Sequence, residues 1–175
     1  CRKYNLKYWC NGGTLIGVVR HVGWIPWDGD IDVGMLENDY EIFKKLAKEE
    51  LDNSMFFYKP WFKPCSKIRS KKAIYKFAVW SKLWDINSGL QLDIFVFKHE
   101  KDMLVIDFKD GDVVNMKYNM IFPLKEAMFE DLKVYIPNKY KEYCIKSWGG
   151  FPPPLIPVNQ RFPHEGKINI KYLHL

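Results

Sequence analysis

Three carboxylates within five residues, Asp28, Asp30 and Asp32, form the part of this sequence with the clearest chemical potential. Carboxylates this close repel one another and resist burial unless a cation neutralises them. On a β-strand, Asp30 and Asp32 would face the same side with their Cα atoms about 6.5–7 Å apart. We therefore predict that they bind a divalent metal, Mg²⁺ or Mn²⁺, together with substrate phosphate. The alternative is a solvated edge strand, because an Asp-x-Asp pair often arises by chance.

A fourth carboxylate, Asp93, lies in the apolar stretch from Leu90 to Phe97. On a strand, Phe95 and Phe97 would share its side, so an exposed face does not explain the acid. An aspartate in such surroundings is usually paired or bound to a metal, and a buried, hydrogen-bonded aspartate is the simpler alternative. If the two acidic strands are neighbours, the metal ligands and candidate catalytic residues are Asp30, Asp32 and Asp93.

A turn of small residues about 16 residues before the acidic strand is the candidate phosphate-binding element. Thr14 is the predicted N-cap of a helix that runs to about His21, and the N-terminal amides of such a helix favour an anion. An ordinary turn would have the same residues. Arginine and lysine side chains could hold a diphosphate. The predicted substrate- and phosphate-binding residues are Gly12, Gly13, Thr14, Arg20, His21, Asp28, Lys67 and Arg69.

Some of these residues have equally good structural explanations. A solvated face would account for Lys67 and Arg69 as well as a diphosphate does. His21 could bind phosphate or hydrogen-bond the turn. Trp24 and Trp27 could stack on a base or form a corner of the core.

The elements that must position these residues follow from the apolar pattern. A strand is predicted over 30–35, followed by a helix from Asp39 to about Leu51 that Asn38 caps, with Ile42 on its apolar face. A last helix is predicted from Asn138 to Trp148, ended by Gly149. Further strands are predicted over 8–10, 56–59, 66–69, 74–80, 90–97, 103–108 and 113–115, with a strand or hairpin over 127–136.

The chain has 175 residues and a net charge of +6, which suggests one domain and suits either an anionic substrate or a lysine-rich surface. The four cysteines contain no Cys-x-x-Cys pair, so we do not expect a zinc finger. No apolar run approaches the roughly 20 residues that span a bilayer. Because the first residue is Cys1 rather than methionine, we expect a piece of a longer chain.

Two segments, GTLIGVVRH at 13–21 and GWIPWDGDIDV at 23–33, resemble the signature of the LicD family. That family includes bacterial phosphocholine transferases and the eukaryotic fukutin and fukutin-related ribitol-phosphate transferases. The resemblance implies an α+β, nucleotidyltransferase-like fold with a mixed β-sheet core flanked by helices, and Asp93 fits the family's third acid. Residues 135–164 are similar to the C-terminal pattern, with a loose match at His164. Gly29 departs from the family, which usually has an acid there.

The resemblance further implies transfer of a phospho-alcohol group, such as phosphocholine or ribitol phosphate, from a CDP-linked donor to a hydroxyl of a glycan or polysaccharide, releasing CMP. Two metals bridged by the three acids could stabilise the attacking and leaving oxygens, and Asp93 could accept the hydroxyl proton. The resemblance leaves the compartment open: it implies the cytoplasm for a bacterial-type member, and the Golgi lumen for a eukaryotic-type member with an anchor in the missing N-terminus.

Two other functions stay open at this point. The chain could be an inactive family member that serves as a binding or scaffold module, for which Gly29 is an argument. It could also be a nucleotidyltransferase acting on RNA. Its lysines are scattered and no RNA-binding motif occurs, so we expect no nucleic-acid partner.

Overall fold

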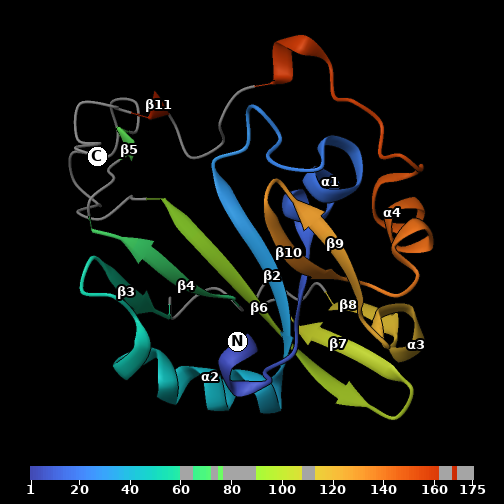
Figure 1. Cartoon of the computed structure of the whole chain (residues 1–175). Helices are drawn as coiled ribbons and strands as arrows, with labels where there is room; N and C mark the ends of the chain where they lie inside the picture. Colours follow the sequence, from blue (N-terminus) through green and yellow to red (C-terminus); the bar gives the residue numbers. More distant parts are fainter. Residues whose placement is uncertain (60–64, 72–74, 77–89, 108–112, 162–166, 169–175) are drawn as a thin grey trace.

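A mixed β-sheet runs through the centre of the molecule (Figure 1). The computed structural model of the chain describes residues 1–59, 65–71, 75–76, 90–107, 113–161 and 167–168. The strands of the main path are, in spatial order, β1 (Tyr8–Cys10), β2 (Asp30–Leu36), β6 (Gln91–Glu100), β4 (Cys65–Ser70) and β3 (Met55–Tyr58). β2 and β6 are parallel, and the other pairs of this path are antiparallel. This arrangement confirms the predicted mixed sheet.

The far end of β6 carries a two-strand extension. β7 (Met103–Asp107) pairs with β6 and with β8 (Val113–Lys117), both antiparallel. The Asp-Gly pair at 110–111 is a sequence signal for a hairpin between β7 and β8, and it lies outside the described residues. Of the strand predicted over 74–80, the structure describes β5 (Tyr75–Lys76), which pairs with β11 (Lys167–Ile168).

Strand alternation gives the central sheet two different faces. We call one the acidic face, because Asp30, Asp32 and Asp93 lie on it. We call the other the apolar face, and its side chains from β2, β6 and β4 are Ile31, Val33, Met35, Leu92, Ile94, Val96 and Ile68. Ile31 and Val33 alternate with the acids along β2, and both belong to this cluster, as strand alternation predicts.

Helix α2 (Glu37–Glu50) packs on the apolar face, below the sheet in Figure 1. Its Tyr40 is 2% exposed and shares a 2.6 Å hydrogen bond with the Ser66 hydroxyl. The predicted Asn38 cap is wrong: β2 runs directly into the helix, so the N-cap position is Leu36 and no side chain caps it. Ile42, predicted to face the core, is half exposed.

Several shorter elements cover the other side, together with the larger core. They are α1 (Gly12–His21), α3 (Tyr118–Ile121), α4 (Tyr140–Trp148) and the hairpin of β9 (Lys125–Phe129) and β10 (Leu132–Ile136). Trp9 is fully buried there, with its ring centroid 5.2 Å from that of Phe97. Because β9 and β10 pair antiparallel across a short turn, the segment 127–136, predicted as a strand or a hairpin, is a hairpin.

Two helix starts differ from the predictions. α1 begins at Gly12 with Asn11 at the N-cap position, so Thr14 is inside the helix and not its cap. α4 begins at Tyr140 rather than Asn138, and it ends as predicted at Gly149, whose φ of 76° is left-handed. Short 3-10 helices cover Arg2–Tyr4 and Val158–Gln160. Among the described residues, no helix has the length and apolarity to cross a membrane.

Candidate metal and phosphate-binding site

The register of β2 and β6 brings the three acids together on the acidic face. Asp32 lies directly opposite Asp93 in the parallel pair, and Asp30 lies opposite Gln91. One carboxylate oxygen from each of Asp30, Asp32 and Asp93 lies within 4.8 Å of the other two. Oxygens bound to one Mg²⁺ at about 2.1 Å can be at most about 4.2 Å apart, so small side-chain rotations are enough to close around an ion. The predicted ligand set therefore fits one divalent cation.

The turn before α1 is built around Asp32. The Gly13 N–H donates to Asp32 Oδ2 at 3.0 Å, and the Asp32 N–H donates to the Thr14 hydroxyl at 2.7 Å. The Asn11 N–H donates to the Asp32 carbonyl at 3.0 Å. In this structure the amide of Gly13, the second residue of α1, is thus aimed at a carboxylate of the protein itself, and the Thr14 hydroxyl binds the backbone of the acidic strand.

The two glycines of this turn are required by the carboxylates beside them. A Cβ on Gly12 would lie 2.1 Å from Asp32 Oδ2, and the φ of Gly12 is +45°. A Cβ on Gly13 would lie 2.3 Å from Asp28 Oδ2. No side chain fits at either contact distance, so Gly12 and Gly13 let the chain pass close to the acids.

Asp32 has an unusual protonation equilibrium. Burial, and then the neighbouring Asp30 carboxylate, raise the pKa of Asp32 to about 7, although the Gly13 hydrogen bond opposes the shift. A bound cation would favour the ionised form. The arrangement is therefore unfavourable for three bare carboxylates and suited to a metal.

No sequence pattern indicated the residue that supports this turn from the side of α4. Tyr143 of α4 is buried, and its hydroxyl donates to Asn11 Oδ1. Burial raises the pKa of Tyr143 far above its usual value, so the hydroxyl stays a donor. Its position at helical spacing in α4 is typical of any core tyrosine.

Lys67 is not on a solvated face. Its side chain is 5% exposed, and its Nζ lies 2.6 Å and 2.5 Å from the two carboxylate oxygens of Asp93. Arg69, the next residue on the same side of β4, lies opposite Gln91, with its guanidinium 5.5 Å from the centre of the Tyr58 ring. The side chain of Gln91 donates to Asp30 Oδ2 at 3.2 Å. The sheet thus brings cations from β4 towards the acids of β2 and β6.

A cavity of about 460 Å³ opens beside the acids, within the size range of small-molecule sites. Its acidic wall contains Asp28, Asp30 and Asp32, and Gly13 lies at its edge. The remaining lining residues come from α1, the following loop and the C-terminal segment, and they are Ile16, Arg20, Ile25, Trp27, Trp148, Pro153, Pro154 and Ile156.

The basic wall of this cavity is tied to the proline-rich segment. Arg20 donates to the Pro153 and Pro154 carbonyls at 3.0 Å and 3.1 Å. The guanidinium of Arg161, which the sequence did not single out, lies 4.9 Å from the centre of the Trp27 ring. Burial, and then Arg161, lower the pKa of Arg20. Arg20 is therefore the guanidinium group that lines the cavity together with the acids, and Arg161 lies beside the Trp27 ring of the same lining.

The other predicted candidates have structural partners. His21 accepts a 3.4 Å hydrogen bond from Arg20 at Nδ1 and packs edge-on against Trp27. Burial, and then Arg20, lower the pKa of His21. Trp24 packs edge-on against Phe129. Gly29 is buried and precedes the first residue of β2, so it lies outside the strand alternation. His164 lies outside the described residues.

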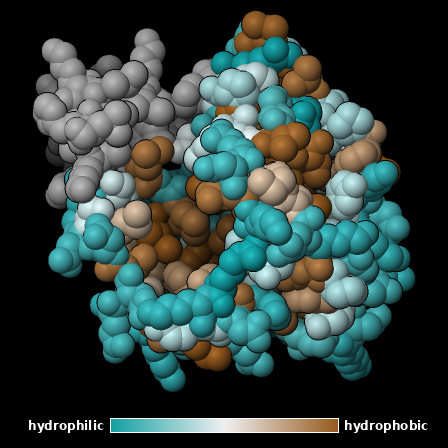
Figure 2. Space-filling model, in the orientation of Figure 1, coloured by the Kyte–Doolittle hydropathy of each residue, from teal (hydrophilic) through white to brown (hydrophobic). Residues whose placement is uncertain are grey.

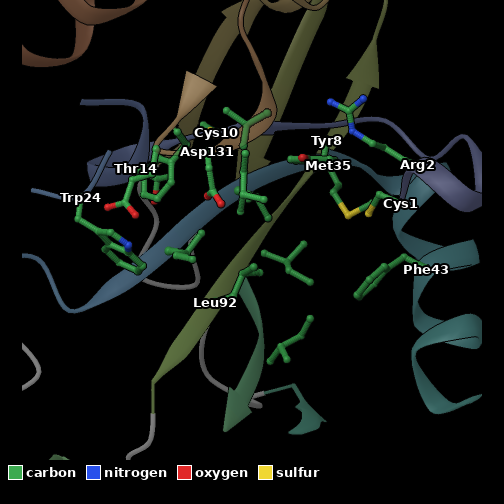
Figure 3. Close-up of a pocket in the computed structure, with 18 of the residues that line it drawn as sticks. Cys1, Arg2, Tyr8, Cys10, Thr14, Trp24, Met35, Phe43, Leu92 and Asp131 are labelled. Carbon is green, nitrogen blue, oxygen red and sulfur yellow. The ribbon is translucent and has the colours of Figure 1, made fainter. Parts of the chain in front are cut away.

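A larger cavity of about 630 Å³ lies on the apolar face (Figure 3). Leu92 and Met35 line its floor, Trp24 and Thr14 lie at one end, and Phe43 lies at the other. Figure 2 shows the same hollow as a brown depression left of the centre. None of Asp30, Asp32 and Asp93 lines this larger cavity. The volume of a cavity therefore does not identify the one beside the acids.

Comparison with known proteins places the chain in a family. Residues 5–139 match the family described as LicD/FKTN/FKRP, nucleotidyltransferase domain. The lipopolysaccharide cholinephosphotransferase LicD of Haemophilus influenzae is 54% identical over 50 residues, which cover 29% of this chain and 19% of that protein. The ribitol 5-phosphate transferase FKRP of Mus musculus is 22% identical over 171 residues, covering 94% of this chain and 31% of that protein.

An uncharacterised protein of Rickettsia typhi is 35% identical over 136 residues, covering 77% of this chain and 37% of that protein. The chain thus spans only part of the length of the relatives that it matches. Among solved structures, the lincosamide antibiotic adenylyltransferase LnuA, bound to lincomycin, aligns with a TM-score of 0.50 and 15% identity. The alignment covers 86% of this chain and 80% of that chain, and it supports the nucleotidyltransferase-like fold.

Proposed function

Because the chain belongs to the LicD/FKTN/FKRP nucleotidyltransferase-domain family, we propose that it transfers a phospho-alcohol group from a CDP-linked donor to a glycan hydroxyl, releasing CMP. The named relatives are transferases of phosphocholine and ribitol 5-phosphate, which supports a transferase of phospho-alcohol groups at family level. The observation that carries the proposal is the convergence of Asp30, Asp32 and Asp93 beside a cavity with a basic wall.

In this proposal Asp30, Asp32 and Asp93 hold Mg²⁺ or Mn²⁺, which would neutralise charge on the donor phosphates. Catalysis of phosphoryl transfer depends mainly on positioning and charge stabilisation, and the residues described here can supply both. The Gly13 and Thr14 hydrogen bonds fix the rotamer and backbone of Asp32. Arg20 supplies positive charge for a diphosphate in the cavity, Arg161 adds charge beside Trp27, and Trp27 supplies an aromatic surface.

The proton acceptor for the attacking hydroxyl is better placed on β2 or just before it than on Asp93. Both oxygens of Asp93 contact the Lys67 ammonium, which makes this carboxylate a weak base. Asp28 and Asp32 line the cavity, and Asp93 is not among its lining residues. Asp32 is assigned to the metal, so we propose that Asp28 takes the proton and that Asp93 supports the metal.

The proposal is tested by CMP release from a panel of CDP-alcohols that includes CDP-choline and CDP-ribitol, with Mg²⁺ or Mn²⁺ present. Asp30→Asn and Asp32→Asn are each expected to lower the rate at least about 10³-fold, as expected for groups that stabilise charge in phosphoryl transfer. Asp131→Asn is the matched control, because Asp131 is an exposed aspartate in the turn between β9 and β10.

Three outcomes would contradict parts of the proposal. Wild-type activity in Asp30→Asn would remove the acids from the mechanism. A wild-type protein that binds metal but releases CMP from no donor would favour the scaffold alternative. Pyrophosphate release from a nucleoside triphosphate and RNA, without CMP release, would favour an RNA nucleotidyltransferase.

A further inference from the structure

Lys67 belongs to a row of three charged side chains that crosses three strands. Asp32 on β2 lies directly opposite Asp93 on β6, and Asp93 lies directly opposite Lys67 on β4. Paired residues in adjacent strands project from the same face, so the row reads acid, acid, base across the acidic face. The ammonium of Lys67 therefore lies on the far side of Asp93 from Asp32, where a second metal ion bound to Asp93 would lie.

The contacts of Lys67 are those of a buried ion pair. The Lys67 side chain is 5% exposed and that of Asp93 is 10% exposed, and Nζ contacts both carboxylate oxygens within 2.6 Å. Burying both ions is costly and needs close geometry to offset the lost hydration. A lysine that served only as a solvated surface charge would not have these contacts.

The protein already donates hydrogen bonds to four of the six oxygens in the three carboxylates. Two belong to Asp93 and face Lys67, one belongs to Asp32 and faces Gly13, and one belongs to Asp30 and faces Gln91. Two-metal sites place ions about 3.5–4 Å apart and need carboxylates whose oxygens are shared between the ions. Asp93, in the middle of the row, would have to be that bridge, and both of its oxygens are directed at Lys67.

Charge leads to the same result. Three carboxylates contribute three negative charges, and the Lys67 ammonium leaves two, which one divalent ion neutralises. We propose that the site binds one divalent cation and that the ammonium of Lys67 takes the place of a second. This inference rests on the metal dependence of the proposed function, and it replaces the expectation of two bridged metals. It does not depend on the identity of the donor.

The test is the number of Mn²⁺ ions bound per chain, measured without donor by electron paramagnetic resonance of free Mn²⁺. Wild type is expected to bind one ion. Lys67→Met, which keeps much of the side-chain volume and removes the charge, is expected to bind two. Lys67→Arg keeps the charge and is expected to bind one. Lys71→Met is the matched control, because Lys71 is exposed just after β4, and it is expected to bind one.

A thermal measurement covers the case in which Lys67→Met folds poorly. Without metal, this variant leaves Asp93 buried beside an apolar side chain, so its Tm should fall below that of wild type. Mn²⁺ should then raise its Tm by more than it raises the wild-type Tm. Two ions in wild type, one ion in a folded Lys67→Met, or no extra stabilisation of Lys67→Met by Mn²⁺ would each overturn the inference.

Failure of this inference is separable from failure of the proposed function. One bound Mn²⁺ without CMP release from any donor would leave the inference standing and remove the function. CMP release with two ions bound would do the reverse. No Mn²⁺ binding in wild type would overturn the inference, whereas CMP release in EDTA would overturn the metal dependence of the proposed reaction.

Discussion

Alternate residues of the same two strands, β2 and β6, form the acidic face and the apolar face. The two faces are nevertheless stabilised in different ways. On the apolar face, Val33, Met35 and Ile94 are nearly inaccessible and need only the volume of their neighbours. On the acidic face, Asp32 and Asp93 each need a specific donor, supplied by Gly13 and Lys67 from other parts of the chain. Burying a charge requires a partner with defined geometry, whereas burying a methyl group requires only contact.

The faces also differ in the kind of cavity beside them. The apolar face has the larger hollow, about 630 Å³, and the acidic face has one of about 460 Å³. Charged groups also line the larger hollow, which includes Arg2, Glu130 and Asp131, but only the smaller one contains residues of the acidic cluster, Asp30 and Asp32. A site for a charged diphosphate is therefore identified by its chemistry rather than by its volume.

The largest expected effect on the free energy of unfolding comes from a substitution on the apolar face, which should leave the reaction unchanged. Ile94→Ala should lower the free energy of unfolding by about 2–5 kcal/mol, because Ile94 is 1% exposed and packed on the apolar face. Leu92→Ala, two residues earlier on the same face and half-buried, should cost less than half as much. Urea unfolding measures both. CMP release per folded molecule should be unchanged in Ile94→Ala, and a large loss would mean that the two faces are not independent.

A smaller effect is expected where a glycine touches an acid. Gly12→Ala should lower the free energy of unfolding by about 1–3 kcal/mol, because a Cβ would meet Asp32 at 2.1 Å and φ is +45°. Displacement of Asp32 should also weaken Mn²⁺ binding. Gly150→Ala is the control, since its nearest contact would be 3.6 Å from the Pro154 ring. Equal Tm values for the two variants would show that the turn moves freely away from Asp32.

The remaining effect is a pH dependence confined to the acidic face. In the folded, metal-free protein the pKa of Asp32 is raised from its usual 3.8 to about 7, so the folded state holds this proton more tightly than the unfolded state. The contribution of Asp32 to stability should therefore fall as pH rises from about 4 to about 7, and stay constant above. Unfolding in EDTA at pH 5 and pH 8 measures it.

Asp32→Asn is the reference for this measurement, because it cannot titrate and it retains the other carboxylates. The stability of wild type relative to Asp32→Asn should be lower at pH 8 than at pH 5. Mn²⁺ should reduce the difference, since it competes with the proton for the same carboxylate. A relative stability that rises with pH would mean that Asp32 ionises easily in the fold and that its burial is not costly.

Local patterns were sufficient for the strands that carry the acids. Alternation of apolar and acidic residues predicted a strand over 30–35 and another over 90–97; β2 includes the first, and β6 begins one residue later than the second and extends to Glu100. The helix starts were less predictable, because they depend on where the preceding strand ends. Leu36 is both the last residue of β2 and the N-cap of α2, so no loop separates the two elements. Asn38 therefore lies inside the first turn of the helix and does not cap it.

The sequence by itself determined which residues could bind a metal and a phosphate, since the type and spacing of Asp30 and Asp32 are local properties of the chain. Only the tertiary structure decided that Asp93 lies directly opposite Asp32 and that Lys67 pairs with it, because strand order and register are set by contacts between distant segments. A lysine on a strand can point to solvent or to a neighbouring carboxylate. Because β4 pairs with β6, Lys67 lies against Asp93 and belongs to the acidic cluster rather than to the solvated surface.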